Sequence, residues 1–576
     1  MSKLDTQLRQ TEDFLKKAYR AALIPGMLSI LSGCANILAD GILVSRYVGA
    51  DGLAAVNLCT PVYLILCIIG SFFVSGAAIL SAQEMGNNQM KEAQAYYGIA
   101  FTACLFFSIL TTATGCLSVY GITRVLEVTG SCQAMVRQYA FVTLAGALPK
   151  IMIYIPFWYL RLEGKHKSVT AMMVIMGAGN IVLDVLFLAA FSWGVFGAAL
   201  ASVIATGAAC IYGFWRLHAK EASFHMELVL PQKEQIKKMA ATGSPAALNN
   251  FFQTIRLMAV NGLLLKAGGS ALVAVFAVIN GISAFTEAVT IGVGQAGSAM
   301  LGVYYGERDN QSARILLRYE VKSGVISCGV FGLCLVAGAE GIRRLYGMEG
   351  SMYLPMAALA LSLIPGMLCN VLTGYYNVSG HAALANGMVF LKGFGFSVAS
   401  LYLLLKAGVL PWLFLVLESV LTLGFWVLCT GIVHKKENTS RFLLMDQTLE
   451  KEGRVINFST ESDDAAICSA SEKITDFCEA NGMEARQVMR VSLALEELMT
   501  LITNKNAPKQ VSFDIRVFSV QGVIGIRIRY DGEDFNPLTA GDEEDEQYMG
   551  IRMIKKLVEE TIYQHTFGMN TLLILI

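Results

Sequence analysis

Long apolar stretches separated by short polar connections occupy the chain as far as His434. Each stretch holds about 20 mostly apolar residues, the length that a helix needs to cross a bilayer. The pattern therefore predicts a multi-pass α-helical membrane protein with twelve transmembrane helices. The predicted spans are 21–44, 53–81, 96–121, 138–160, 168–191, 195–217, 244–266, 271–303, 315–338, 352–378, 384–406 and 410–433.

The twelve segments fall into two similar halves, because the longest and most polar connection, 218–243, separates the sixth segment from the seventh. Local spacings recur in the two halves, and each recurring glycine lies at a polar turn that closes a segment. We therefore expect two six-helix lobes, 1–217 and 244–433, that face a cavity at the midplane of the membrane. The recurring positions are Pro149 to Gly164 with Pro365 to Gly380, and Gly86 with Gly306.

Lysine and arginine gather in three of the short connections. Cytoplasmic loops of membrane proteins carry an excess of these residues. The connections that hold Lys91, the group from Arg161 to Lys167 and the group from Arg216 to Lys238 are thus expected in the cytoplasm. An even number of segments returns the chain to its starting side, so we expect a plasma-membrane protein with both termini in the cytoplasm.

The apolar stretches stop after His434. A polar linker, 434–453, leads into 454–576, where helix and strand signals alternate. This order predicts a separate soluble α/β sandwich. Its predicted strands are 454–459, 511–520 and 523–530, its predicted helices are 463–480, 484–503 and 550–559, and the tail to Ile576 is predicted to form a hairpin.

The composition fits a chain that lies mostly in lipid. Hydrophobic residues make up 55% of the sequence and charged residues only 15%, far from the balance of a soluble protein. The net charge of zero averages two unlike parts, and no basic arm indicates a nucleic-acid partner. The 13 cysteines include no Cys-x-x-Cys pair, so neither a disulfide framework nor a cysteine metal site is expected.

Three polar side chains stand out inside apolar segments. Asn180 and Asp184 lie one helical turn apart, and Asp40 lies in the first segment. An ionisable residue at the centre of a membrane helix costs about 2.5 to 3.5 kcal/mol, so it usually faces a partner, a cavity or an ion path. Two carboxylates and an amide oxygen could form a cage for Na⁺, or a pair that shares a proton.

At these residues the sequence resembles the MATE (multidrug and toxic compound extrusion) family. The similarity is carried by Asp40 to Asn57, Leu160 to Asp184, Gly194 to Ser202 and Gly292 to Gly306. The resemblance implies a two-lobed exporter that alternates between inward-open and outward-open states and exchanges a small organic substrate for Na⁺ or H⁺.

The resemblance also implies roles for individual residues. It places a cation site at Asp40, Asn180, Asp184 and Ser202, and a bend of the first helix at Pro25. Glu287, in the eighth segment, is a candidate for a second substrate or proton site, with a merely pore-facing glutamate as the alternative. Na⁺ or H⁺ would be the coupling ion, and no other cofactor is required.

The tail resembles the GHKL ATPase fold, most closely the small kinases of the anti-sigma-factor type. The residues that carry this resemblance, and with it a candidate nucleotide site, are Glu497, Asp531, Gly532 and Gly550. Two positions depart from the family, because Leu501 replaces the asparagine that binds Mg²⁺ and Tyr530 falls where the adenine-binding aspartate belongs. We therefore expect a degenerate regulatory domain, doubtful as a site for ATP and Mg²⁺, with a cytoplasmic protein as its partner.

Three functions remain open at this point. The first is secondary active export of drug-like or metabolic molecules, which is not an enzymatic activity. The second is a flippase for lipid-linked sugars, which should lack the Asp40, Asn180 and Asp184 constellation. The third is a membrane-bound signalling kinase or anti-sigma-like binding protein, which intact nucleotide boxes would favour. No Gly-Lys-Ser/Thr sequence occurs, so the signature of ATP-driven pumps is absent.

Overall fold

The computed structural model of the chain divides into two compact units. The described residues are 3–125, 131–219, 223–346, 350–437, 439–440, 442–520, 523–540, 549–558, 560–566 and 569–576. The transmembrane unit comprises Ala21–Glu307 and Leu317–Lys436. The sheet unit comprises Met1–Arg20, Arg308–Leu316 and Glu437–Ile576.

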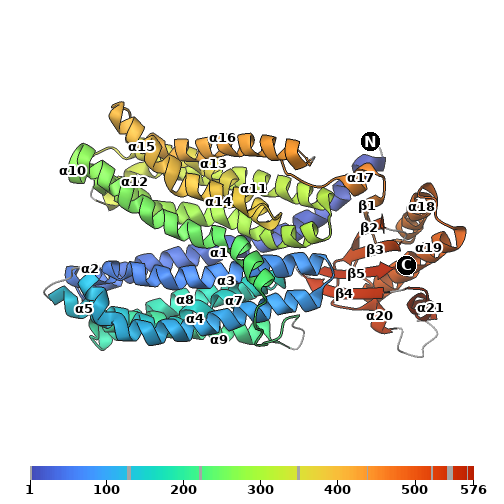
Figure 1. Cartoon of the computed structure of the whole chain (residues 1–576), viewed down its shortest axis with the longest axis horizontal. Helices are drawn as coiled ribbons and strands as arrows, with labels where there is room; N and C mark the ends of the chain where they lie inside the picture. Colours follow the sequence, from blue (N-terminus) through green and yellow to red (C-terminus); the bar gives the residue numbers. More distant parts are fainter. Residues whose placement is uncertain are drawn as a thin grey trace. The chain divides into compact units, whose positions relative to one another are not determined.

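The first bundle of the transmembrane unit is drawn from blue to green in Figure 1. Its helices are long because apolar residues fill them and glycine or polar turns end them. Its elements are α1 (Lys3–Tyr47, whose first residues belong to the sheet unit), α2 (Ala50–Leu58), α3 (Thr60–Gly86), α4 (Met90–Val125), α5 (Ser131–Ala145), α6 (Ala147–Met152), α7 (Tyr154–Leu162), α8 (His166–Asp184), the π-helical η1 (Val185–Ala190) and α9 (Gly194–Leu217).

The second bundle runs from green to orange (Figure 1). Its longest helix, α10, turns sharply at Gly268 and Gly269, where the backbone leaves helical geometry. Its elements are α10 (Lys233–Gly306), α11 (Asn310–Ala337, whose first residues belong to the sheet unit), α12 (Ala339–Leu345), α13 (Tyr353–Val378), α14 (Ala382–Phe390), the π-helical η2 (Leu391–Gly395), α15 (Phe396–Lys406), η3 (Pro411–Leu413) and α16 (Phe414–Glu437).

The two halves end corresponding helices in the same way. Gly164 follows α7 with φ 75°, and Gly380 follows α13 with φ 79°. Both glycines therefore adopt the left-handed conformation that commonly ends a helix. The local repeat predicted from the sequence is present in the backbone at these positions.

Ten helices of the described residues are long and apolar enough to cross a membrane, or eleven if the bent pair Gln133–Ala145 and Ala147–Leu162 is one span. The predicted segment 244–266 is helical, as part of α10, but does not pass this test. It carries Asn249, Gln253 and Arg256, which line a cavity. The multi-pass helical architecture is thus present, whereas the count of twelve spans stays a prediction.

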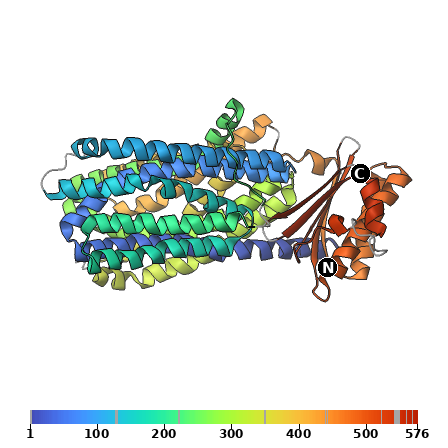
Figure 2. The same cartoon turned by 90° about the horizontal axis from the view of Figure 1, so that it is seen from below.

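The sheet unit contains five antiparallel strands in the order β1-β2-β3-β5-β4. Apolar side chains alternate with polar ones along its central strands, so one face meets the helices in a hydrophobic core. Figure 2 shows the helices on this face. The elements are α17 (Thr448–Lys451), β1 (Val455–Glu461), α18 (Asp464–Ala480), α19 (Ala485–Asn506), β2 (Ser512–Val520), β3 (Val523–Tyr530), α20 (Pro537–Ala540), α21 (Met549–Leu557), β4 (Glu560–Thr566) and β5 (Met569–Leu575).

The other face of this sheet carries buried charges. Arg516 of β2 and Arg527 of β3 are directly paired in the strand register, and their side chains are only 2% and 4% exposed. Asp514 of β2 lies within 2.7 Å of Arg527. Asp309, from the short segment Arg308–Leu316 of the same unit, lies 2.9 Å from Arg527 and 3.3 Å from Arg516.

Candidate functional site

Asn180 and Asp184 lie on one face of α8, four residues apart. The side-chain amide of Asn180 donates a hydrogen bond to Oδ2 of Asp184. Both side chains are buried, and Asp184 is fully shielded from solvent. The other carboxylate oxygen of Asp184, Oδ1, has no hydrogen-bond partner among the described residues. A buried acceptor without a partner is costly, so this oxygen is suited to a ligand or a proton.

Asp40 reaches the same place from α1. Its carboxyl group lies close enough to that of Asp184 for the two groups to interact directly. Two carboxylates repel each other at short distance, so their proximity favours binding of a proton or a cation between them. The structure thus brings together the three polar residues that the sequence singles out, from two different helices.

Asn36 is a further polar residue on α1 that the sequence reasoning missed. It precedes Asp40 by four residues, as Asn180 precedes Asp184, so Asn-Ile-Leu-Ala-Asp on α1 resembles Asn-Ile-Val-Leu-Asp on α8. A Cβ placed on Gly177 of α8 would lie 3.8 Å from the Cβ of Asn36, so the two helices face each other here. The buried Oδ1 of Asn36 has no hydrogen-bond partner within the described part of the chain.

Lys150 of α6 supplies a cation to this region. It is only 7% exposed, its Nζ lies 5.3 Å from the centre of the Tyr63 ring, and it interacts electrostatically with Asp40. Two carboxyl groups that share one proton, together with one lysine, carry no net charge. In the sequence, Lys150 is the single lysine inside the predicted span 138–160. It was missed because the sequence reasoning considered carboxylates only.

Ser202 and Pro25 lie on helices next to α8. Ser202 is half-buried on α9, which packs against α8, since a Cβ placed on Gly179 of α8 would lie 3.7 Å from the Cβ of Ala205 on α9. The carbonyl of Pro25 accepts a hydrogen bond of 3.4 Å from the Thr170 hydroxyl on α8. A cation ligand at Ser202 and a functional bend at Pro25 stay predictions.

The arrangement fits a small cation or a proton. Carboxylate and amide oxygens are the ligands that hard cations prefer. Among the described residues, no group of three or more His, Cys, Asp or Glu side chains could hold a metal ion. Two carboxylates opposed by one lysine therefore favour a single positive charge over a divalent metal. The π-helical η1 begins directly after Asp184, and such segments are frequent at functional sites.

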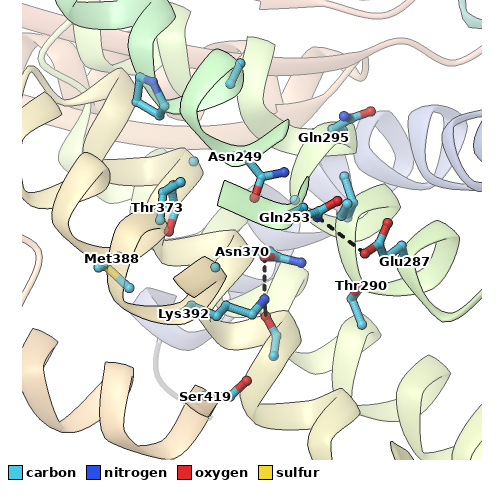
Figure 3. Close-up of a pocket in the computed structure, with 18 of the residues that line it drawn as sticks. Asn249, Gln253, Glu287, Thr290, Gln295, Asn370, Thr373, Met388, Lys392 and Ser419 are labelled. Carbon is cyan, nitrogen blue, oxygen red and sulfur yellow. Dashed lines mark hydrogen bonds between the residues drawn. The ribbon is translucent and has the colours of Figure 1, made fainter. Parts of the chain in front are cut away.

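Glu287 lies on α10 and lines a separate cavity of about 270 Å³ in the transmembrane unit (Figure 3). Its Oε1 accepts a hydrogen bond of 3.4 Å from the amide of Gln253. Arg256, Lys392 and Glu418 line the same cavity. The sequence reasoning singled out Glu287 alone and passed over the other three charges, although each of them also lies in a predicted membrane span.

The four residues proposed for a nucleotide lie along α19 and near its end. A Cβ placed on Gly550 would lie 2.1 Å from Oε2 of Glu497, and one on Gly532 would lie 2.6 Å from Oδ1 of Asn506. Asp531 accepts a hydrogen bond of 2.7 Å from the backbone of Ser512. It also forms an ion pair with Lys17.

The two residues that depart from the nucleotide-binding pattern, Leu501 and Tyr530, both have packing roles in the sheet unit. Leu501 packs against the hydrophobic core of the sheet unit, so no amide oxygen for Mg²⁺ stands at this position. Tyr530 is fully buried, and its hydroxyl donates to the carbonyl of Phe535. Asp531 is committed to backbone and lysine partners. These residues do not fit Mg²⁺ and a nucleotide.

Residues 27–186 and 245–404 match the MatE family. The chain is 22% identical over 352 residues to the probable multidrug resistance protein YoeA of Bacillus subtilis, covering 59% of this chain and 76% of that protein. It is 23% identical over 382 residues to the multidrug export protein MepA of Staphylococcus aureus strain MRSA252, covering 64% and 82% respectively.

Solved structures share the fold. An outward-facing multidrug resistance MATE family transporter of the MOP superfamily superposes with a TM-score of 0.68 at 22% identity, over 73% of this chain and 96% of that one. A MOP superfamily transporter from Pyrococcus furiosus, described by the reverse polarity of its binding pocket, gives a TM-score of 0.67 at 22% identity, over 76% and 99%.

Proposed function

Because the chain belongs to the MatE family, we propose that it exports small organic compounds in exchange for Na⁺ or H⁺ bound between Asp40 and Asp184. Members of this family are secondary transporters, so the chain is a multi-pass membrane transporter and not an enzyme. The exported compounds are drug-like or metabolic molecules, by analogy with the two bacterial relatives named for multidrug resistance or export.

The observation that carries the coupling proposal is the contact between the carboxyl groups of Asp40 and Asp184. With a proton or a cation present, the two groups attract each other through it. After its loss, two carboxylates in a medium of low dielectric repel each other strongly. Occupancy of the site therefore controls whether α1 and α8 stay together. Binding and release of the coupling ion would in this way favour different conformations of the transporter.

The electrical potential across the membrane supplies enough energy for such an exchange. One elementary charge that crosses about 100 mV gains roughly 2.3 kcal/mol, which corresponds to about a fifty-fold substrate gradient. Asn36, Asn180 and Ser202 would supply neutral oxygens to the bound ion. Lys150 would offset the carboxylate that remains ionised.

The sheet unit is proposed to regulate transport. It includes Arg308–Leu316, and Asn310 within that segment begins α11, a helix with the composition of a membrane span. Asp309, directly before α11, is held by Arg516 and Arg527 of the sheet. A cytoplasmic protein that binds the sheet unit would thereby affect the start of α11. The distribution of lysine and arginine supports a cytoplasmic location for both termini.

The test is efflux of ethidium, a fluorescent organic cation, from proteoliposomes under imposed Na⁺ or H⁺ gradients. Wild type is compared with Asp184→Asn. Efflux that depends on one gradient and is lost in the variant would support the proposal and identify the ion. Equal efflux in both proteins would overturn the role of Asp184.

A further inference from the structure

The cavity beside Glu287 is lined by two acidic and two basic side chains, all from the second bundle. Arg256 and Glu418 neutralise each other, because Nη1 of Arg256 lies 3.0 Å from Oε1 and 3.2 Å from Oε2 of Glu418. Glu418 is buried. The charges of this pair are matched at contact distance, and Arg256 interacts with Glu287 only over a longer range.

Glu287 and Lys392 are not paired in this way. Lys392 donates to two neutral oxygens, Oδ1 of Asn370 at 2.9 Å and the carbonyl of Gly366 at 3.1 Å. Glu287 accepts a hydrogen bond from the neutral amide of Gln253 and interacts with Arg256 and Lys392 only at longer range, as far as the described residues show. Within the described part of the chain, neither side chain has an oppositely charged partner at ion-pair distance. Figure 3 shows both reaching toward the space around Asn370 from different helices.

A separated pair of opposite charges is costly in the interior of a membrane protein. The backbone around Lys392 indicates that these separated charges belong to a functional site. Lys392 lies inside η2, one of the two π-helical segments among the described residues, and η1 adjoins Asp184. Insertions of this kind are found mostly at functional sites. Lys392 thus shares this backbone feature with the carboxylate assigned to ion coupling.

We propose that this cavity binds a dipolar organic molecule, whose carboxylate meets Lys392 and whose ammonium group meets Glu287. A ligand of this class would satisfy both charges at once, and the amides of Asn249, Gln253 and Asn370 would bind its polar groups. The volume of about 270 Å³ lies near the lower end of small-molecule sites, so the ligand has about the size of an amino acid with one aromatic substituent.

This inference deepens the proposed function by naming a substrate class, and it rests on that function only for transport. Binding can therefore be measured without any gradient. The full-length protein in lipid nanodiscs is titrated with three fluorescent probes, and anisotropy reports binding. The probes are 7-methoxycoumarin-4-yl-alanine, its methyl ester, which lacks the carboxylate, and its N-acetyl derivative, which lacks the ammonium group.

The dipolar probe should bind at least about ten times more tightly than either derivative, because each charged hydrogen bond in a buried site contributes more than a neutral one. Lys392→Met should abolish the preference for the free acid over the methyl ester. Glu287→Gln should abolish the preference for the free amine over the acetyl derivative. Each variant should leave the other preference in place.

Controls separate this result from misfolding. Lys406→Met, which removes an exposed lysine at the end of α15, should preserve both preferences. Lys392→Arg, which keeps the charge, should retain a preference for the carboxylate. Equal binding of all three probes to the wild type, or loss of both preferences in each single variant, would overturn the proposal.

The two proposals fail in different ways. Asp184→Asn should still discriminate among the three probes in nanodiscs, although coupled transport is lost. If ethidium efflux depends on a gradient and on Asp184 but the probes bind without discrimination, the substrate class is wrong and the transport proposal stands. If the probes are discriminated but neither a Na⁺ nor a H⁺ gradient drives efflux of ethidium or of the dipolar probe, the cavity is a ligand site and the transport proposal fails.

Discussion

Gly86 at the end of α3 and Gly306 at the end of α10 lie against each other. A Cβ placed on Gly86 would lie 3.0 Å from the Cα of Gly306 and 2.1 Å from the carbonyl of Val303. A Cβ placed on Gly306 would lie 2.9 Å from the Cα of Gly86. These are recurring positions of the two halves, so the bundles meet at this end through corresponding backbones with no side chain between them.

Gly86→Val should therefore separate α3 from α10 at this end. Overpacking of a close contact costs about 1 to 3 kcal/mol, which lowers the population of the state in which the two glycines touch by roughly five- to 150-fold. Spin labels at Asn87 and Tyr305, both exposed, should report a longer distance through weaker dipolar broadening of the continuous-wave EPR spectrum in a cysteine-free background. Gly121→Val, at a position with open space around it, should leave the distance unchanged. An unchanged distance in Gly86→Val would show that this contact does not hold the bundles together.

Asn36→Ala should weaken binding of the coupling ion. The variant removes a buried amide oxygen that has no hydrogen-bond partner in the described residues, so little folding stability should be lost. The half-saturating ion concentration for efflux should rise about tenfold, because one ligand oxygen is lost while Asp40 and Asp184 remain. Asn57→Ala, an exposed position on α2, is the control. If both variants behave as wild type, Asn36 is not a ligand.

Lys150→Met should change the number of ions that move with each substrate. Without the lysine, the carboxyl pair must recruit a second positive charge to reach neutrality. The Hill coefficient for the coupling ion should rise from near one toward two, and the charge moved per substrate should increase. Lys150→Arg keeps the positive charge and should preserve the wild-type coefficient. A coefficient that stays at one in Lys150→Met would exclude the lysine from the charge balance.

Asp309→Asn should destabilise the sheet unit and alter transport. Removal of one partner from a buried ion pair costs about 3 to 5 kcal/mol, although Arg527 would retain Asp514. The midpoint of thermal unfolding, followed by scanning fluorimetry, should fall by several degrees. Efflux at a fixed gradient should change as well, if this unit regulates the transporter. Asp476→Asn, at an exposed position on α18, should change neither quantity.

The same residue gives the sheet unit a defined pH dependence. Burial alone would raise the pKa of Asp309, but the guanidinium groups of Arg516 and Arg527 outweigh it and hold the pKa well below its usual range. A lowered pKa in the folded state contributes stability above the unfolded pKa of about 3.9 and loses it as the pH falls. Wild type should thus lose stability below about pH 4, whereas Asp309→Asn should lose less over the same interval. Parallel pH profiles would contradict this assignment.

The sequence predicted some parts of the molecule well and others not at all, for physical reasons. Strands such as Val523–Tyr530 alternate strictly between core and polar face, so their bounds follow from the pattern. Asp184 could be found because a carboxylate in an apolar segment is costly. Lys392 is likewise a charged residue in an apolar segment, but the sequence reasoning passed over it. The distance between Lys392 and Glu287 is set by the folded structure and cannot be derived from the sequence. The contact of Asp309 with Arg527 spans 218 residues of chain, and no local pattern predicts it.

The most direct test of the central claim is to observe the coupling ion move as substrate moves in the opposite direction. Proteoliposomes that contain the pH dye pyranine, or a fluorescent Na⁺ indicator, are mixed with ethidium in the absence of any imposed ion gradient. The account predicts that entry of ethidium through the wild-type protein drives a counterflow of H⁺ or Na⁺, and that Asp184→Asn abolishes this counterflow. Ethidium movement without a counterflow of either ion, or an equal counterflow in Asp184→Asn, would contradict it.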